Sequence, residues 1–176
     1  MGSRGVGASE AWALGIVDVG LIVISHCENP AKKEAVDFLE KIFLDRINAK
    51  IPVSNFIGAY HILTRYLRVK RELARIELLK TLELRHPSLI PDVTVDHAIA
   101  AIKNAVKYRI EGWDGYIISL ADALGASIIY TIDQRLTKVR HLSIVIPISK
   151  VTLQSCLLYT SPSPRDRTRS RMPSSA

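Results

Sequence analysis

Two short apolar runs, each of which brings an aspartate to the end of a strand, constrain the fold of this chain most strongly. The first, GIVDVGLIVI, begins at Gly15 and contains Asp18, and the second, SIIYTI, ends directly before Asp133. Runs of this length that are rich in Val and Ile are typical of strands buried in a parallel sheet. We therefore predict one strand that begins at Gly15, ends near Asp18 and passes into a turn or helix, and another strand over 127–132.

Amphipathic segments occupy most of the chain between these strands. Apolar residues recur at helical spacing, which predicts helices over 31–49, 55–66, 69–84, 93–110 and 113–124. Further short strands are expected over 51–53 and 143–148. Strands that alternate with helices favour a parallel sheet packed between helices. The predicted fold class is therefore α/β, as a single domain with a central parallel sheet flanked by helices.

The two ends of the chain lack the pattern of the middle. Residues 1–14 show no period, and we expect a loose leader there. Residues 156–176 resemble a translated sequencing adapter, because their first six residues, CLLYTS, can be encoded by TGT CTC TTA TAC ACA TCT, a transposon end used in library preparation. We expect a non-native tail there, and a domain over 15–155 that has lost its own C-terminus. A genuine disordered basic tail is the alternative.

The net charge of the chain is +7, but the suspected tail contributes four Arg and one Asp, which leaves +4 for the rest. A mildly basic domain permits nucleic-acid binding without requiring it. No apolar run reaches the roughly 18 residues of a membrane span, and no signal-peptide pattern is present, so we expect a cytoplasmic protein without membrane contact. The two cysteines give neither a disulfide framework nor metal-ligand spacing.

Three aspartates are the strongest candidates for chemistry. Asp18 and Asp133 follow the two core strands, and Asp114 lies in the first turn of the apolar helix that precedes the second strand. Ligands of open parallel sheets bind outside the carboxyl ends of the strands, so Asp18 and Asp133 should meet at one edge, where a helix N-terminus could add Asp114. The structural alternatives are a helix cap for Asp114 and an ordinary turn residue for Asp133.

Carboxylates gathered in this way repel one another unless a cation binds or their pKa values rise. Hard cations such as Mg²⁺ and Mn²⁺ prefer oxygen ligands. A metal ion held there could activate a water molecule and stabilise the charge that develops on a scissile phosphate. The three positions therefore outline a phosphodiesterase site.

Longer segments add a family resemblance. IVDVGLIVIS, IPVSNFIGAYHIL and GWDGYIISLADALGASIIYTIDQRL, followed by a late strand, come in the order of PIN-domain nucleases, over about residues 15–148. The most specific parts, WDGYIISLADALGA and YTIDQRL, resemble the third and fourth acidic motifs of that family. The resemblance implies that Asp18, Asp114 and Asp133 bind Mg²⁺ or Mn²⁺ and are catalytic in RNA hydrolysis. It also implies frequent homodimers and, in some members, a toxin controlled by an antitoxin-like protein.

One position departs from the family pattern. The family places a glutamate about six residues after the serine of its second motif, here Ser54, whereas this chain has Tyr60, followed by His61. His61 could replace the missing ligand, since imidazole suits Mn²⁺ better than Mg²⁺, or it could be an ordinary surface or polar-packed histidine. Glu111 could supply the absent carboxylate from an adjoining turn, or it could be an exposed loop acid without a role.

Basic residues form one further cluster, which could follow an RNA backbone through phosphate contacts or could simply be a solvated helix face. Its members are Arg65, Arg68, Lys70, Arg71 and Arg75.

The leading hypothesis is a metal-dependent endoribonuclease, and the main alternative, motivated by Tyr60, is a degenerate PIN-like domain that binds RNA or a protein partner without cleavage. A receiver-like phosphate-transfer domain is a third reading; Lys150 would fit it, but the required acidic pair near the first strand is absent.

Overall fold

The computed structural model describes residues 13–91 and 93–154, which contain one parallel sheet of five strands. The strands lie in the order β3-β2-β1-β4-β5, and every neighbouring pair is parallel. Their bounds are β1 (Gly15–Val17), β2 (Ala49–Pro52), β3 (Leu89–Ile90), β4 (Ile128–Tyr130) and β5 (Ser143–Val145). The parallel α/β fold predicted from the alternation of strands and helices is confirmed.

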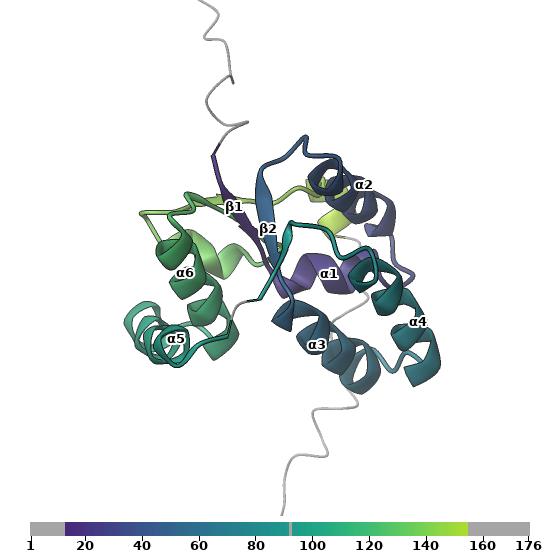
Figure 1. The fold of residues 1–176 in the computed structure, drawn as a ribbon, viewed down its shortest axis with the longest axis horizontal. Helices are drawn as coiled ribbons and strands as arrows, with labels where there is room; N and C mark the ends of the chain where they lie inside the picture. The colour runs from purple at the N-terminus through teal and green to yellow at the C-terminus, as the bar shows by residue number, and fades with distance from the viewer. Residues whose placement is uncertain (1–12, 92, 155–176) are drawn as a thin grey trace, which may run out of the picture.

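Helices cover both faces of this sheet (Figure 1). One face carries α1 (Val19–Ser25), α2 (Lys32–Phe43), α3 (Ser54–His61) and α4 (Arg71–Leu82), and the other carries α5 (Val95–Tyr108) and α6 (Gly112–Leu124). A π-helical turn, η2 (Ile62–Tyr66), follows α3, and a 3₁₀ helix, η3 (Gln134–Lys138), follows β4. Helices on both faces leave no side of the central strands open to water, which explains their unbroken apolar sequence.

The two central strands are anchored in two separate apolar cores. Val17 and Tyr130 belong to the core under α1, α2, α3 and α4, whereas Ile16 and Ile129 belong to the core under α5 and α6. Successive residues of a strand point to opposite faces of the sheet, and helices cover both faces of this sheet, so neighbouring residues enter different cores. Because both faces of β1 and β4 are fixed by packing, the residues that follow these strands are held in defined positions.

The sequence pattern predicts most elements of the structure, with two deviations. As predicted, the first apolar run divides at Asp18, which is the N-cap of α1 and accepts a hydrogen bond from the Val19 N–H at 2.7 Å. The helix predicted over 55–66 is divided into α3 and η2. Strand β3 is not apparent from the sequence, because its two residues are too few to show a period; pairing with β2 defines it.

The chain beyond β5 returns to α2. Glu34 on α2 accepts hydrogen bonds from the backbone N–H of Ser149 at 2.6 Å and from the Thr152 hydroxyl at 2.6 Å. The side chain of Leu153 is buried in the core under α1, α2, α3 and α4. The expected tail over 156–176 and most of the expected leader over 1–14 lie outside the described residues. No helix in the described part of the chain is long and apolar enough to cross a membrane.

Candidate functional site

The carboxyl ends of β1 and β4 lie side by side at the centre of the sheet. Strands β2 and β3 continue the sheet on one side of β1, and β4 and β5 continue it on the other, so the strand order reverses between β1 and β4. The Asp18 N–H donates to the Tyr130 carbonyl at 2.9 Å, which extends this pairing one residue beyond β1. Ligand sites of open α/β sheets form at such a reversal. The three predicted aspartates are found at this point.

Asp18 is buried, and both of its carboxylate oxygens have partners. Oδ1 accepts the Val19 N–H at 2.7 Å, and Oδ2 accepts the Thr131 hydroxyl at 2.7 Å. Burial raises the pKa of Asp18, outweighing these two hydrogen bonds, and the negative charge of Asp133 raises it further. The carboxylate is therefore held in one orientation, at an electrostatic cost that a nearby positive charge would remove.

Asp114 reaches the same place from the first turn of α6. Its Oδ2 accepts the Glu111 N–H at 3.4 Å, as part of a reciprocal capping box with that residue. Burial raises the pKa of Asp114 to about 6, and the charges of Asp18 and Asp133 add to this effect. The helix-cap reading of Asp114 is thus correct, and it coexists with the predicted convergence of the three carboxylates.

Asp133 points towards Arg135, which the sequence analysis did not identify. The Arg135 Nε donates to Asp133 Oδ2 at 2.8 Å, and its Nη2 donates to the same oxygen at 2.5 Å. Burial raises the pKa of Asp133, but the hydrogen bonds from Arg135 more than offset it, so the pKa lies below its usual value. Asp133 also accepts the Arg135 backbone N–H at 2.8 Å, which is the turn role considered for it.

Two buried polar residues that the sequence analysis missed hold this arrangement together. The Thr131 hydroxyl donates to Asp18 and accepts the Asp133 N–H at 3.0 Å, so it links the ends of both strands. Asn55 on α3 donates from Nδ2 to the Val17 carbonyl at 2.7 Å, just before Asp18. Thr131 could have been suspected, since it lies two residues before Asp133 at a strand end. No sequence signal connects Asn55 with a carbonyl 38 residues away.

Of the two predicted auxiliary ligands, Glu111 contacts a residue of the site, whereas His61 makes no described contact with it. Glu111 joins the site indirectly, because its Oε1 accepts the Arg135 Nη1 at 3.0 Å while the rest of its side chain is exposed. His61 is exposed at the end of α3 and makes an edge-on ring contact with Tyr66 at 5.6 Å. Within residues 13–91 and 93–154, no hydrogen bond or ion pair connects His61 with the three aspartates.

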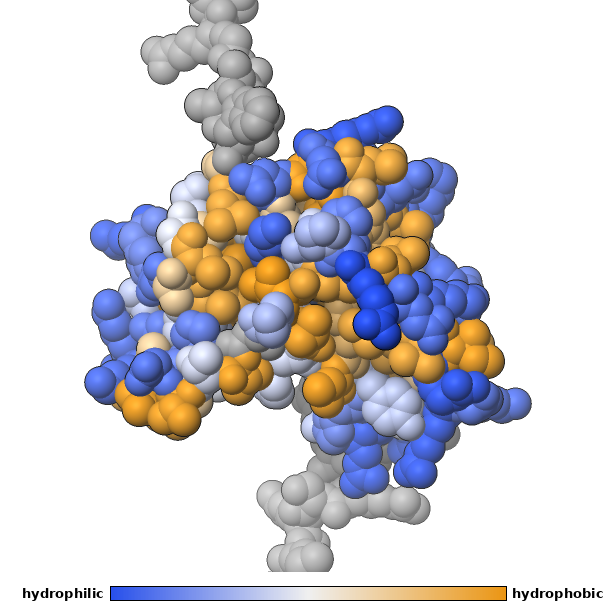
Figure 2. All heavy atoms as spheres, viewed as in Figure 1, coloured by the Kyte–Doolittle hydropathy of each residue, from blue (hydrophilic) through white to orange (hydrophobic). Residues whose placement is uncertain are grey.

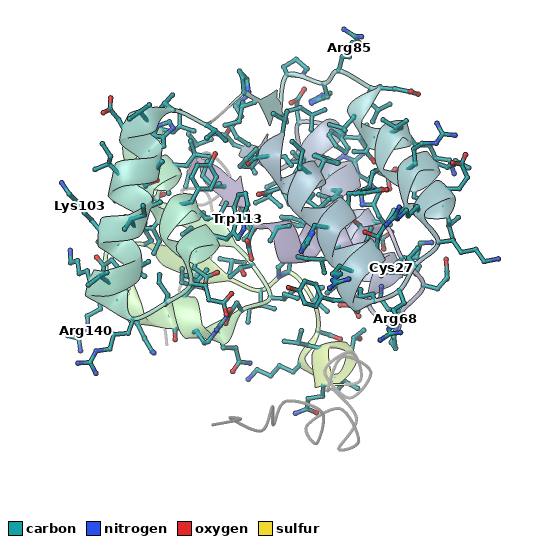
Figure 3. All side chains as sticks on the ribbon, turned by 90° about the horizontal axis from the view of Figure 1, so that it is seen from below. Cys27, Arg68, Arg85, Lys103, Trp113 and Arg140 are labelled. Carbon is teal, nitrogen blue, oxygen red and sulfur yellow. The ribbon has the colours of Figure 1, made fainter. Side chains whose placement is uncertain are left out.

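The predicted basic residues divide between two hollows. Arg65, Arg68 and Arg71 line one with Tyr60 and His61, which we call the basic hollow. Figure 3 shows Arg68 on the opposite side of the molecule from Lys103 and Arg140, with Trp113 near the middle of the view. Lys70 instead lines the second hollow, and Arg75 pairs with Glu72 on α4.

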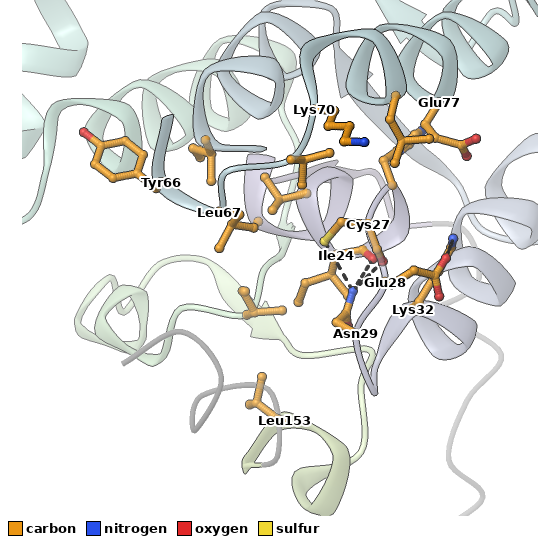
Figure 4. A pocket seen from close by; sticks show the side chains of 17 residues that line it. Ile24, Cys27, Glu28, Asn29, Lys32, Tyr66, Leu67, Lys70, Glu77 and Leu153 are labelled. Atoms are coloured by element: carbon orange, nitrogen blue, oxygen red, sulfur yellow. Dashed lines mark hydrogen bonds and ion pairs between the residues drawn. The ribbon is translucent and has the colours of Figure 1, made fainter. Parts of the chain in front are cut away.

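The second hollow, of about 940 Å³, lies between α1, η2 and α4, and we call it the apolar hollow. Figure 4 shows Tyr66, Leu67 and Leu153 around it, with Lys32, Lys70 and Glu77 among the charged residues that line it. Gly20 and Ile132 also line it, and a Cβ at Gly20 would lie 3.6 Å from Asp18 Oδ2. The apolar hollow therefore begins beside Asp18.

The donor chemistry of the three aspartates fits a hard divalent cation. Their carboxylates follow β1, follow β4 and lie in the first turn of α6; the charges of Asp18 and Asp133 add to the rise in the pKa of Asp114, and the charge of Asp133 adds to that of Asp18. Among the described residues, however, no three His, Cys, Asp or Glu side chains are grouped closely enough to hold a metal ion as they stand. Asp133 is turned to Arg135, whose Nη2 also lies 3.7 Å from Asp114 Oδ2.

Comparisons with known proteins agree with this geometry. A chain in the crystal structure of VapBC2 from Rickettsia felis, bound to a DNA fragment from their promoter, superposes with a TM-score of 0.54 at 15% identity, covering 75% of this chain and 97% of that one. No curated protein sequence matches the chain. The model of the PIN domain family matches residues 16–142, a span that contains Asp18, Asp114 and Asp133. The chain therefore belongs to the PIN domain family.

Proposed function

We propose that this protein is a metal-dependent endoribonuclease whose catalytic residues are Asp18, Asp114 and Asp133. The observation that carries the proposal is the convergence of three carboxylates at the reversal of strand order, where the pKa of Asp114 rises to about 6. A bound Mg²⁺ or Mn²⁺ would lower the pKa of a coordinated water molecule and offset charge on the scissile phosphate. Thr131 and Asn55 would serve as positioning residues, since they fix Asp18 and the end of β1.

The basic hollow supports RNA as the substrate. Three arginines, Arg65, Arg68 and Arg71, line this single concave surface. Guanidinium groups bind phosphates in a bidentate manner, and phosphate contacts position a nucleic acid without reading its sequence. We therefore assign these arginines to the backbone of the RNA, and we assign Lys70 no such role. A cytoplasmic location would agree with this substrate.

Two protein partners belong to the proposal. The apolar hollow would accept apolar side chains of an antitoxin-like protein, with Lys32, Lys70 and Glu77 offering charges to it. A second copy of the chain would pack on α5, where Val95, Ile99, Ile102 and Val106 form an exposed apolar stripe. Figure 2 shows apolar side chains gathered at the lower left, where Figure 1 places α5.

The spacing of the α5 stripe favours self-association. Its four residues follow one another at intervals of four, three and four, which is the pattern of a coiled-coil seam. In an antiparallel pair about a twofold axis, Ile99 would face Ile102 of the second copy, and Asp96 would lie near its Lys103. The stripe is therefore complementary to itself in both shape and charge.

Tyr60 favours one other function, a domain that binds RNA without cutting it. Tyr60 stands where the family has a carboxylate, and it lines the basic hollow. The site would then have three acidic ligands, supplemented only by Glu111, which is paired with Arg135. Loss of one acidic ligand lowers the affinity for a hard cation, while the arginines of the basic hollow remain available for RNA.

Cleavage of a fluorogenic single-stranded RNA by the full chain tests the proposal. The reaction would be run with Mn²⁺, with Mg²⁺ and with chelator, beside Asp114→Asn and His61→Ala. We expect metal-dependent cleavage that falls at least a hundredfold in Asp114→Asn and by less than about tenfold in His61→Ala, because His61 lines the basic hollow but makes no described contact with the aspartates.

The outcomes separate the two functions. Cleavage that Asp114→Asn retains would contradict the site. RNA binding without cleavage by a folded protein in Mn²⁺ would instead identify the binding domain. In that case Tyr60→Glu is the first variant to test for a gain of cleavage.

A further inference from the structure

We propose that Arg135 is an internal counter-ion that competes with the divalent cation for Asp133, so that the metal binds only when the guanidinium moves away. This inference rests on the proposed function, because it concerns loading of the same site. It assigns a regulatory role to Arg135, which is not among the residues predicted to bind the metal.

The contacts of Arg135 are those of a cation in an acidic cluster. Nε and Nη2 both donate to Asp133 Oδ2, at 2.8 and 2.5 Å, and Nη1 donates to Glu111 Oε1 at 3.0 Å. Nη2 also lies 3.7 Å from Asp114 Oδ2. One guanidinium thus connects acids from three places in the chain: the end of β4, the N-cap of α6 and its first turn.

The charge balance explains why this arrangement forms. Asp18, Asp114 and Asp133 repel one another in a partly dehydrated site, and Arg135 supplies the positive charge nearest to Asp133 and Asp114. A divalent cation held by these carboxylates would supply twice that charge and would draw on Asp133, as Arg135 does. Coulomb repulsion between the cation and the guanidinium disfavours the presence of both beside Asp133.

Arg135 is free to make this exchange. Its side chain is 53% exposed, so the guanidinium can turn into water without leaving a buried charge behind. Asp133, in contrast, is held at its backbone by Thr131 and stays in place when Arg135 departs. The exchange therefore requires the hydrogen bonds of Arg135 to break and its side chain to change rotamer, without movement of the backbone of Asp133.

Isothermal titration of the full chain with Mn²⁺ tests the inference, comparing wild type with Arg135→Gln and Lys138→Gln. Lys138 is the matched control, because it also acts on the charge of Asp133, and among the described contacts it does so without a hydrogen bond. We expect Arg135→Gln to bind Mn²⁺ about tenfold more tightly, since a hydrogen-bonded ion pair no longer has to be broken. Lys138→Gln should change the affinity by less than about threefold, through its charge alone.

Thermal unfolding in chelator supplies a second readout. Arg135→Gln should lower the unfolding temperature of the metal-free protein, because the carboxylates lose their counter-ion, and saturating Mn²⁺ should restore it. A purely structural Arg135 would give the lower temperature without the tighter Mn²⁺ binding. Equal Mn²⁺ affinities of Arg135→Gln and Lys138→Gln would overturn the inference.

The result also distinguishes this inference from the proposed function. If wild type binds Mn²⁺ and Asp133→Asn does not, the metal site stands, whatever Arg135→Gln shows. If only Arg135→Gln binds Mn²⁺, the guanidinium blocks the site and the inference is supported in its strongest form. If wild type, Arg135→Gln and Lys138→Gln all fail to bind Mn²⁺, both proposals fall.

Discussion

At the scale of single residues, Asp114 carries much of the electrostatic cost of the site. Its side chain is 11% exposed, and burial together with Asp18 and Asp133 raises its pKa from 3.8 to about 6. At pH 7 the folded protein must therefore keep a carboxylate ionised where ionisation is unfavourable. Ionising Asp114 therefore costs about 3 kcal/mol more in the folded state than in the unfolded state, if Asp114 is treated as an independent group.

This cost predicts how stability depends on pH. Between about pH 4 and pH 6 the folded state holds a proton on Asp114 that the unfolded state has lost, so this group lowers the stability as pH rises through that window. Asp114→Asn removes the effect. In chelator, we expect the variant to be more stable than wild type by about 2–3 kcal/mol at pH 7.5 and by little at pH 4.

Urea unfolding of both proteins across this pH range measures the difference. Subtracting the unfolding free energy of wild type from that of Asp114→Asn at each pH removes the contribution of groups common to both proteins. One such group is His26, whose pKa is lowered chiefly by burial. A variant that is equally stable or less stable than wild type at pH 7.5 would show that Asp114 is not destabilised by its neighbours.

The sequence predicts the three aspartates because two of them end core strands and the third begins a helix, all of which are local patterns. It does not predict Arg135, Thr131 or Asn55, whose roles arise from contacts between segments that only the folded chain brings together. His61 is the opposite case, since its neighbour Tyr60 made it a candidate ligand, but the end of α3 leaves it exposed.

At the scale of elements, the position of Asp114 depends on the close packing of α5 and α6. A Cβ at Gly115 would lie 2.2 Å from the Ala101 carbonyl oxygen and 2.9 Å from the Ala105 backbone nitrogen. Only a glycine permits the two helix backbones to approach this closely. Because Gly115 directly follows Asp114, this close contact also fixes the first turn of α6 relative to the sheet.

Gly115→Ala should therefore lower the free energy of unfolding by about 3 kcal/mol, since backbone atoms cannot move aside as a flexible side chain can. Gly112→Ala is the matched control: it lies at the start of the same helix with nothing within 4 Å of its added Cβ. Chemical denaturation should leave this control within about 0.5 kcal/mol of wild type or make it more stable. Equal effects of the two substitutions would contradict the packing argument.

Element boundaries show the same division between local and distant causes. The turn from β1 into α1 is predictable, because Asp18 is both the end of an apolar run and a good N-cap. Strand β3 and the change from α3 to η2 are not, since they depend on the register with β2 and on the packing of the following turn.

At the scale of the whole molecule, the exposed stripe on α5 predicts association. Val95, Ile99, Ile102 and Val106 lie on a face of α5 away from Ala101, which packs against α6. Burying four such side chains in a twofold pair favours a dimer through the hydrophobic effect. Ile102→Glu would place charges at the centre of that pair.

Analytical ultracentrifugation of the full chain at micromolar concentration should give a dimer for wild type and a monomer for Ile102→Glu. Ile57→Glu, on an apolar residue of α3 that is 76% exposed, provides the matched control and should remain dimeric. A wild-type monomer, or loss of the dimer in both variants, would refute the α5 interface.

The repulsion among Asp18, Asp114 and Asp133 would tie the lifetime of this protein in a cell to its supply of cations. Molecules without metal would carry this electrostatic cost, which Arg135 reduces in part, and so would open more often. A difference of 1–2 kcal/mol is enough to change the abundance of a marginally stable protein several-fold through proteolysis. If the proposed activity is correct, scarcity of the cation would both stop the reaction and remove the protein, so that the number of molecules would follow the fraction that holds metal.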